Sequence, residues 1–383
     1  MEKMNNLAST NQYKVFGPNL SAPLLFCAGL CLLLLTLYSC QDSEENLMDG
    51  LNIPHQGYHF NLSDYGFFSG DMRNLDPVDS LLPYDLNTEL FSDYTKKQRF
   101  VYIPEGEPAQ ITDKNTLEFP DGSVLIKNFY YQHDERDPAL GRTLIETRLL
   151  KLRQGDWTAN TYVWNEEQNE AFLRQTGSNQ EISWLDHQGV ERLVNYRIPS
   201  VNDCSTCHSK QSKMVPLGPE ADNLNREYAY SSGKENQLEI WRSRGFLSAD
   251  TELASLSEMP VWDDPSTGTL NNRARAYLHV NCSSCHNPEG SARNSALFLE
   301  YAQEDPYNIG VCKTPVAAGS GSGGLRYSIE PGSPDESILF YRMESVKPQE
   351  RMPEIGRTVV HEEAVALIRD WIETMDLPAC GGS

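Results

Sequence analysis

Two copies of the pattern C-x-x-C-H constrain this chain more than any other feature. They read Cys-Ser-Thr-Cys-His at 204–208 and Cys-Ser-Ser-Cys-His at 282–286. Two cysteines three positions apart lie on one face of a helical turn, and the histidine follows directly. Each copy therefore gathers two thiols and one imidazole at a single point of the fold, and 74 residues lie between Cys207 of the first copy and Cys282 of the second.

This spacing is the covalent attachment signature of c-type haem. The two thiols can form thioethers with the vinyl groups of a porphyrin, and the imidazole then binds the iron. A haem held in this way cannot dissociate, which suits an exported protein. We therefore expect two covalent haems, attached at Cys204, Cys207, Cys282 and Cys285, with proximal iron ligands His208 and His286.

Three other uses of paired cysteines compete with haem: a redox dithiol, a zinc site and a structural disulfide. A thioredoxin-like dithiol needs a βαβ context, and none surrounds either motif. The separation between the motifs exceeds that of ordinary structural zinc modules, and zinc would leave two histidines unexplained. The pattern favours haem.

Two further cysteines, Cys312 and Cys380, follow the second motif. Oxidising compartments favour pairing of such thiols. We expect a disulfide that ties the loop after the second motif to the C-terminal tail, with two free thiols as the alternative.

An uncharged apolar run of 16 residues occupies 23–38. It is short for a membrane-spanning helix. The sequence Leu-Tyr-Ser-Cys at 37–40 resembles a bacterial lipoprotein processing site, which implies a signal peptide over 1–39 and lipidation of Cys40. An uncleaved anchor and a plain secretory signal are the alternatives. All three export the chain, so we expect a periplasmic or cell-surface protein, an outer-membrane lipoprotein held by its lipid, with an acidic tether over 40–57.

The composition is strongly acidic, with 54 Asp and Glu against 32 Lys and Arg and a net charge of −22. Residues 1–39 contain two Lys and one Glu, so their removal leaves −23. Such a chain repels phosphate backbones, which excludes nucleic acid as a partner. Redox partner proteins with a basic docking patch are the better complement.

The segment 58–200 has the pattern of an all-β domain. Runs rich in β-branched and aromatic residues recur between turn signals, which predicts a sandwich or barrel. The predicted strands are 99–103, 116–119, 123–131, 143–152 and 157–164. From 201 onward the pattern changes to helices and loops, with predicted helices at 235–244, before Cys282 and around 365–375.

The region from Asn271 to Leu377 resembles class I cytochrome c, with an entry helix, the second motif, a loop, Arg-Met-Pro at 351–353 and a closing helix. The resemblance implies that Met352 is the distal ligand of the second haem. Met352 as a core filler is the alternative.

The region 201–265 resembles the same family less completely. The resemblance implies that the Pro219 carbonyl accepts a hydrogen bond from the His208 imidazole. Met259, which precedes a proline, is the first candidate for the distal ligand there. Met214, His187 and an open coordination position are the alternatives.

Taken together, a leader, a β domain and two haem segments resemble a family of bacterial diheme c-type cytochromes. The resemblance implies a multidomain fold, with an N-terminal all-β sandwich or barrel-like domain at 58–200 followed by mainly α cytochrome c-like modules at 201–265 and 266–383. It implies electron transfer through two haems and no catalytic side chain.

Two other functions stay open. One is a diheme peroxidase-like enzyme, or another haem oxidoreductase, with an open iron at the first haem. The other is a surface binding module in which sheet aromatics such as Tyr130, Tyr131 and Trp164 bind a target while the haems relay charge.

Overall fold

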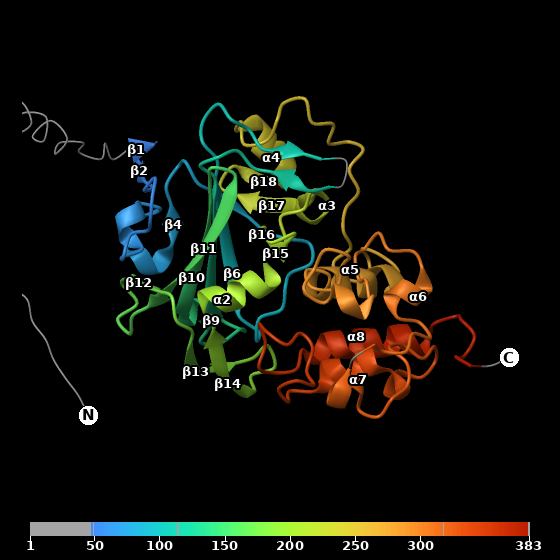
Figure 1. Cartoon of the computed structure of the whole chain (residues 1–383). Helices are drawn as coiled ribbons and strands as arrows, with labels where there is room; N and C mark the ends of the chain where they lie inside the picture. The colour runs from blue at the N-terminus through green and yellow to red at the C-terminus, as the bar shows by residue number, and fades with distance from the viewer. Residues whose placement is uncertain (1–46, 49, 113–114, 317, 382–383) are drawn as a thin grey trace, which may run out of the picture. The chain divides into compact units, whose positions relative to one another are not determined.

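The computed structural model describes residues 47–48, 50–112, 115–316 and 318–381 (Figure 1). The predicted signal peptide and Cys40 lie outside the described residues. From Leu47 to Ser383 the chain forms one compact unit. Among the described residues, no helix combines the length and the apolar character that crossing a membrane requires.

A six-stranded antiparallel sheet lies at the centre of the N-terminal half, in the order β12-β11-β10-β9-β6-β5. Its strands are β5 (Leu82–Tyr84), β6 (Lys96–Tyr102), β9 (Val124–Gln132), β10 (Arg142–Arg153), β11 (Asp156–Trp164) and β12 (Ala171–Arg174). Four of the five predicted strands coincide with β6, β9, β10 and β11 to within three residues at either end. The fifth is the short β8.

Short antiparallel pairs surround this sheet. They are β1–β2 (Leu47–Met48, Leu51–Asn52), β3–β4 (Phe68–Ser69, Asp76–Pro77), β7–β8 (Gln110–Ile111, Leu117–Glu118), β13–β14 (Ser178–Leu185, Glu191–Ile198), β15–β16 (Ser209–Lys210, Lys213–Met214) and β17–β18 (Glu227–Tyr230, Gly233–Asn236).

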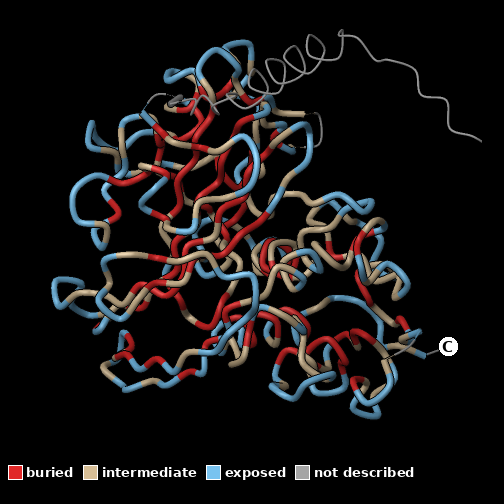
Figure 2. The backbone as a smooth tube through the Cα atoms, turned by 60° about the vertical axis from the view of Figure 1, so that its left-hand side comes forward, coloured by how far each residue is buried: buried red, intermediate tan, exposed pale blue. Residues whose placement is uncertain are grey.

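Side chains alternate between the two faces of the sheet along each strand. Both faces are buried under other parts of the chain. One face, with Phe100, Ile126 and Tyr162, packs under the segment 51–81. The opposite face carries two apolar patches. One patch, around Val101 and Leu125, lies under the helices that follow the sheet, and the other lies under β13–β14. Buried residues accordingly run along the strands in Figure 2.

The segment 201–265 contains short helices and two hairpins. The helices are α2 (Val201–Cys207), α3 (Ala221–Leu224) and α4 (Gln237–Ser243). Leu224, Leu238 and Trp241 are fully buried and share one apolar cluster with sheet residues. The apolar face of this segment is therefore covered by the sheet.

The segment 266–383 has an apolar core of its own, built mainly from three helices. Its helices are α5 (Leu270–Cys282), α6 (Pro306–Ile309), α7 (Ile338–Glu344) and α8 (Glu362–Glu373). A disulfide joins Cys312 to Cys380, with 5.1 Å between their Cα atoms.

These observations correct the expected fold class. Strands make up 28% and helices 22% of the structure, so the part after residue 200 is not a pair of mainly α cytochrome modules. Of the seven helices in the described part, only α5 and α8 exceed seven residues. Helical spacing of apolar residues in 201–265 indicates a buried face but not its partner, which is the sheet. The sheet itself is open, with β12 and β5 at its edges, and does not close into a barrel.

The packing of α4 on the sheet can be tested with Leu238→Ala. Leu238 is fully buried in the cluster shared with the sheet. Its truncation should lower the free energy of unfolding by about 2–5 kcal/mol in a denaturant titration. Leu193→Ala is the matched control, because Leu193 is 69% exposed, and its effect should stay within about 0.5 kcal/mol. Equal effects of the two substitutions would contradict this packing.

Candidate haem sites

The first motif is carried by α2, which begins directly after the sheet hairpin β13–β14. A capping box starts the helix: the Ser200 hydroxyl accepts from the Asp203 amide, and the Asp203 carboxylate accepts from the Ser200 amide. Cys204 and Cys207 then stand three positions apart on α2, and His208 follows its last residue. Cys204 packs against the apolar cluster between the sheet and α4.

The His208 imidazole is oriented as an iron ligand requires. Its Nδ1 lies 2.8 Å from the Val215 carbonyl oxygen, so Nδ1 carries the hydrogen and Nε2 keeps a free lone pair. Burial, together with the nearby charges of Lys127 and Arg148, lowers the pKa of His208 to about 4. The ring is therefore neutral at neutral pH.

The carbonyl partner of His208 differs from the expected one. The Pro219 carbonyl was predicted for this role, and the structure gives it to Val215. The reason is the hairpin β15–β16, which turns at Gln211 and Ser212, both with positive φ, and returns the chain to the imidazole.

The second motif begins at the last residue of α5, Cys282, and α5 is the longest helix of the described part. The Thr269 hydroxyl caps its first turn by accepting from the Asn272 amide. The His286 Nδ1 lies 3.4 Å from the Ser295 hydroxyl oxygen. Burial lowers the pKa of His286 to about 4, although an interaction with the Leu297 backbone, 11 residues further along the chain, opposes this shift. This imidazole too is neutral and held by its Nδ1 side.

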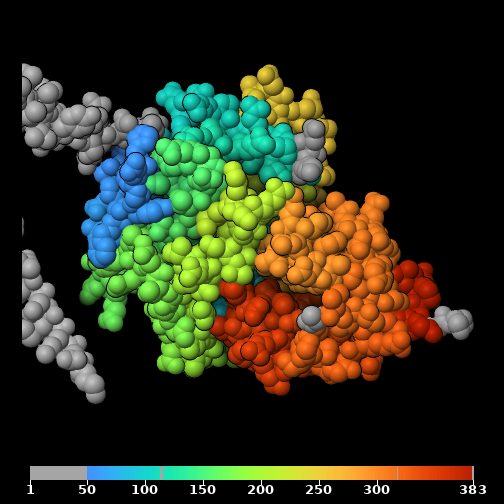
Figure 3. Space-filling model, in the orientation of Figure 1, coloured from blue at the N-terminus to red at the C-terminus, as the bar shows by residue number. Residues whose placement is uncertain are grey.

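The two motifs meet in space. The Cys285 thiol lies 4.0 Å from the carbonyl oxygen of Thr206 in the first motif. Its interaction with the neighbouring Cys207 thiol lowers the pKa of Cys285 to about 6 and raises that of Cys207. Beside them Lys210 and Glu289 form an ion pair of 3.3 Å, and the Gln211 amide donates to Glu289. In Figure 3 the segment after residue 200 accordingly lies against the segment that carries the second motif. Sequence spacing gave no sign of this contact.

Met352 lies at the second motif. It lines a small cavity together with Cys282, Met343 and His361. Its backbone amide donates to the Arg342 carbonyl at 2.9 Å. The predicted distal ligand and the first cysteine of the motif therefore face one space.

Sequence reasoning missed Arg357, which fixes the loop that carries Met352. Its side chain is buried, with 4% exposure. The guanidinium donates to the carbonyls of Met352 (2.8 Å), Ser345 (2.8 Å) and Met343 (3.0 Å). Arg357 lies in a segment without helix or strand, where the sequence shows no periodic pattern that would indicate this role.

Asp93 holds the same loop from the sheet side. Its carboxylate accepts from the Thr358 amide at 2.6 Å, the Val359 amide at 3.1 Å and the Thr358 hydroxyl at 2.9 Å. Asp93 is 2% exposed, and burial raises its pKa. Because Asp93 lies three residues before the start of β6, it ties the Met352 loop to the sheet.

The other predicted ligands of the first haem are placed elsewhere. Met259 is buried, and its amide donates to the Asp222 carbonyl at 2.9 Å. Within the described residues, no hydrogen bond or shared apolar cluster joins Met259 to His208. His187 is exposed in the turn between β13 and β14. Met214 pairs with Ser209 in the hairpin β15–β16 and directly precedes Val215, whose carbonyl contacts Nδ1 of His208.

The side chains present at both motifs fit a covalent haem. Each offers two free thiols and one neutral imidazole, whose Nδ1 lies against the Val215 carbonyl at the first motif and the Ser295 hydroxyl at the second. Among the described residues, no group of three or more His, Cys, Asp or Glu is arranged to hold a metal ion by itself.

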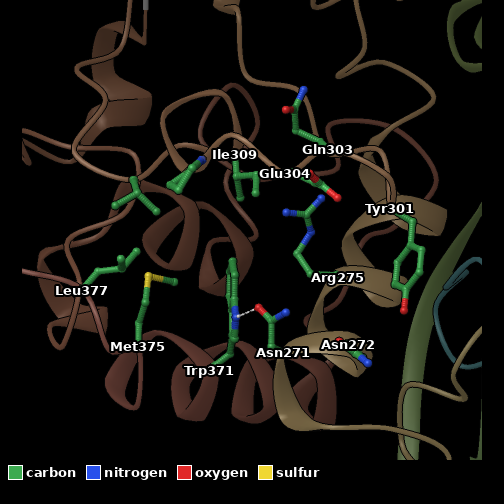
Figure 4. A pocket seen from close by; sticks show the side chains of 12 residues that line it. Asn271, Asn272, Arg275, Tyr301, Gln303, Glu304, Ile309, Trp371, Met375 and Leu377 are labelled. Carbon is green, nitrogen blue, oxygen red and sulfur yellow. Dashed lines mark hydrogen bonds between the residues drawn. The ribbon is translucent and has the colours of Figure 1, made fainter.

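A further cavity, of about 420 Å³, lies between α5 and α8 (Figure 4). Arg275, Tyr301 and Met375 line it, and the Trp371 indole donates to Asn271 at its edge. Of the described residues around it, none is a predicted haem ligand.

No protein-family model, curated protein or solved structure matches the chain.

Arg357→Gln tests the clamp on the Met352 loop. The shorter amide leaves several buried carbonyls without donors, so the free energy of unfolding should fall by at least about 2 kcal/mol. Arg351→Gln is the control on the same loop, because Arg351 makes only longer contacts of 3.3 and 3.4 Å. An equal loss in both variants, measured by denaturant titration, would contradict the clamp.

Acid should weaken the haem-free chain through the two motif histidines. Their pKa is lowered from 6.5 to about 4, so the folded state binds fewer protons than the unfolded state between these values. This contribution is present in full above pH 6.5 and is lost as the pH falls toward 4. His208→Gln should make the fall in unfolding free energy shallower across that window. An unchanged slope would show that His208 is not protected from protonation.

Proposed function

We propose that this protein transfers electrons through two covalently attached haems outside the cytoplasm. The observation that carries the proposal is the contact between the two attachment motifs, where the Cys285 thiol lies 4.0 Å from the Thr206 carbonyl oxygen and interacts with the Cys207 thiol. Haems attached at both motifs would be close neighbours, and an electron could pass directly from one to the other.

The haem supplies an iron that gains and loses one electron when bound. The chain supplies the rest. Cys204, Cys207, Cys282 and Cys285 would hold the two porphyrins, and His208 and His286 would bind the irons through Nε2. The Val215 carbonyl keeps the hydrogen of His208 on Nδ1, and the Ser295 hydroxyl and the Leu297 carbonyl hold the His286 ring. Met352, held by Arg357, would supply a thioether ligand, which favours the reduced state of an iron.

The same proposal includes export and membrane attachment. The leader and Cys40 support a bacterial lipoprotein of the periplasm or cell surface. The net charge of −22 supports docking with redox partner proteins through a basic patch.

One observation favours a second candidate, a haem oxidoreductase that reacts at the first iron. Met259 has no interaction within the described residues that brings it to His208, and such an iron would keep an exchangeable position. The binding-module alternative loses support, because Tyr131 is 2% and Trp164 5% exposed in the sheet cores.

Haem content and carbon monoxide binding test the proposal. Protein matured in a host with haem-attachment machinery should carry two covalent haems by mass, and Cys204→Ser or Cys282→Ser should each halve that content. Met352→Ala should lower one reduction potential and open that iron to carbon monoxide, whereas Met375→Ala should do neither. Colourless protein would end the proposal. Carbon monoxide binding by the unchanged protein would favour the oxidoreductase.

A further inference from the structure

A row of like charges crosses the sheet on the face that bears the first motif. Arg148 on β10, Lys127 on β9 and Arg99 on β6 stand directly opposite one another in the strand register. Lys97 lies two residues before Arg99 on the same face. Like charges directly opposite each other destabilise a sheet, so this row requires anions close by.

The described residues supply anions to all but one of these cations. Arg99 lies 2.7 Å from Asp85 and 2.9 Å from Glu89. Lys97 lies 3.5 Å from Glu89, and Arg148 donates to both carboxylate oxygens of Glu146.

Lys127, in the middle of the row, has neither an ion pair nor a hydrogen bond among the described residues. Its ammonium lies 5.1 Å from the centre of the Phe129 ring, which Arg148 also contacts. Four basic side chains share three carboxylates, and Lys127 is left without one. Burial and the charges of Arg99, Lys97 and Arg148 therefore lower the pKa of Lys127 well below its ordinary value. An unpaired charge in a half-buried site is unfavourable unless a partner arrives.

The position of the first motif indicates what that partner is. Helix α2 contacts β11, the neighbour of β10 on the side away from β9, and it crosses in front of the sheet in Figure 1. The charge of Arg148 lowers the pKa of both Cys204 and His208. The charge of Lys127, which lies one strand further on, also lowers the pKa of His208. The row therefore leads away from the cysteines and past the imidazole.

We propose that Lys127 binds a propionate carboxylate of the haem attached at Cys204 and Cys207. This inference rests on the proposed function, since it requires that haem. The vinyl and propionate groups lie on opposite edges of a porphyrin. A haem held by its vinyl edge above β11 extends its propionate edge across β10 toward β9, where Lys127 stands.

The proposal also gives the sheet a role. The sheet binds the anionic edge of the first haem while α2 binds the opposite edge. The positive row makes that iron easier to reduce, because a nearby cation disfavours the higher charge of the oxidised state.

Lys127→Met tests the proposal in the haem-loaded protein, because it keeps the aliphatic stem and removes the charge. We expect both haems to remain attached. One reduction potential should fall by about 59 mV, equivalent to a tenfold shift of a one-electron couple, while the other stays unchanged. The propionate bending bands of one haem should shift in the resonance Raman spectrum, and Lys127→Arg should restore them.

Lys96→Gln is the matched control, since Lys96 lies on β6 with its side chain on the opposite face and 50% exposed. It should leave both the potentials and the bands unchanged. Two attached haems with unshifted propionate bands in Lys127→Met would overturn the inference and leave the proposed function intact. Absence of covalent haem from the unchanged protein would overturn both.

Discussion

The connection between β5 and β6, residues 85–95, holds the three parts of the molecule together. The Thr88 hydroxyl donates to the Pro260 carbonyl, and the Thr88 amide donates to the side-chain oxygen of Asn223. The Phe91 amide donates to Asn281, the residue before Cys282, at 2.8 Å. Asp93 then binds the loop after Met352. Because one short segment contacts both motif-bearing segments and continues into the sheet, the positions of the two motifs are set relative to the same strand.

This arrangement explains why the segment after residue 200 is not an independent helical module. Its helices are too short to be stable without tertiary contacts, and Leu238 and Trp241 find those contacts on the sheet. The first motif thus stands on a surface that mixes an apolar patch with a charged row. The second motif stands at the end of a long helix over an apolar core. One chain therefore offers two different environments to chemically identical motifs.

The sequence could predict the attachment chemistry and most of the central strands. The motifs are local, and the alternation in β9 and β10 is local too, so each is visible in a window of ten residues. The contact of Cys207 with Cys285 and the clamp of Arg357 depend on how distant segments pack, and nothing in their spacing indicates it. Pro219 shows the same limit, because the hairpin that brings Val215 to His208 is stabilised by backbone pairing and not by a recognisable side chain.

The different environments imply that the two irons, once bound, would have unequal affinities for an electron. At the first site, Lys127 and Arg148 lie close enough to affect His208, and their charge favours the reduced iron. At the second site burial is the main influence on His286, ahead of the Leu297 backbone and the charge of Arg342, and the proposed Met352 thioether would add to it. Charge at one site and ligand type at the other can be altered separately, because Lys127 belongs to the sheet and Met352 to a loop held by Arg357. Substitutions at these two positions would thus change the difference between the potentials without moving the Cys207–Cys285 contact through which we propose that the electron passes.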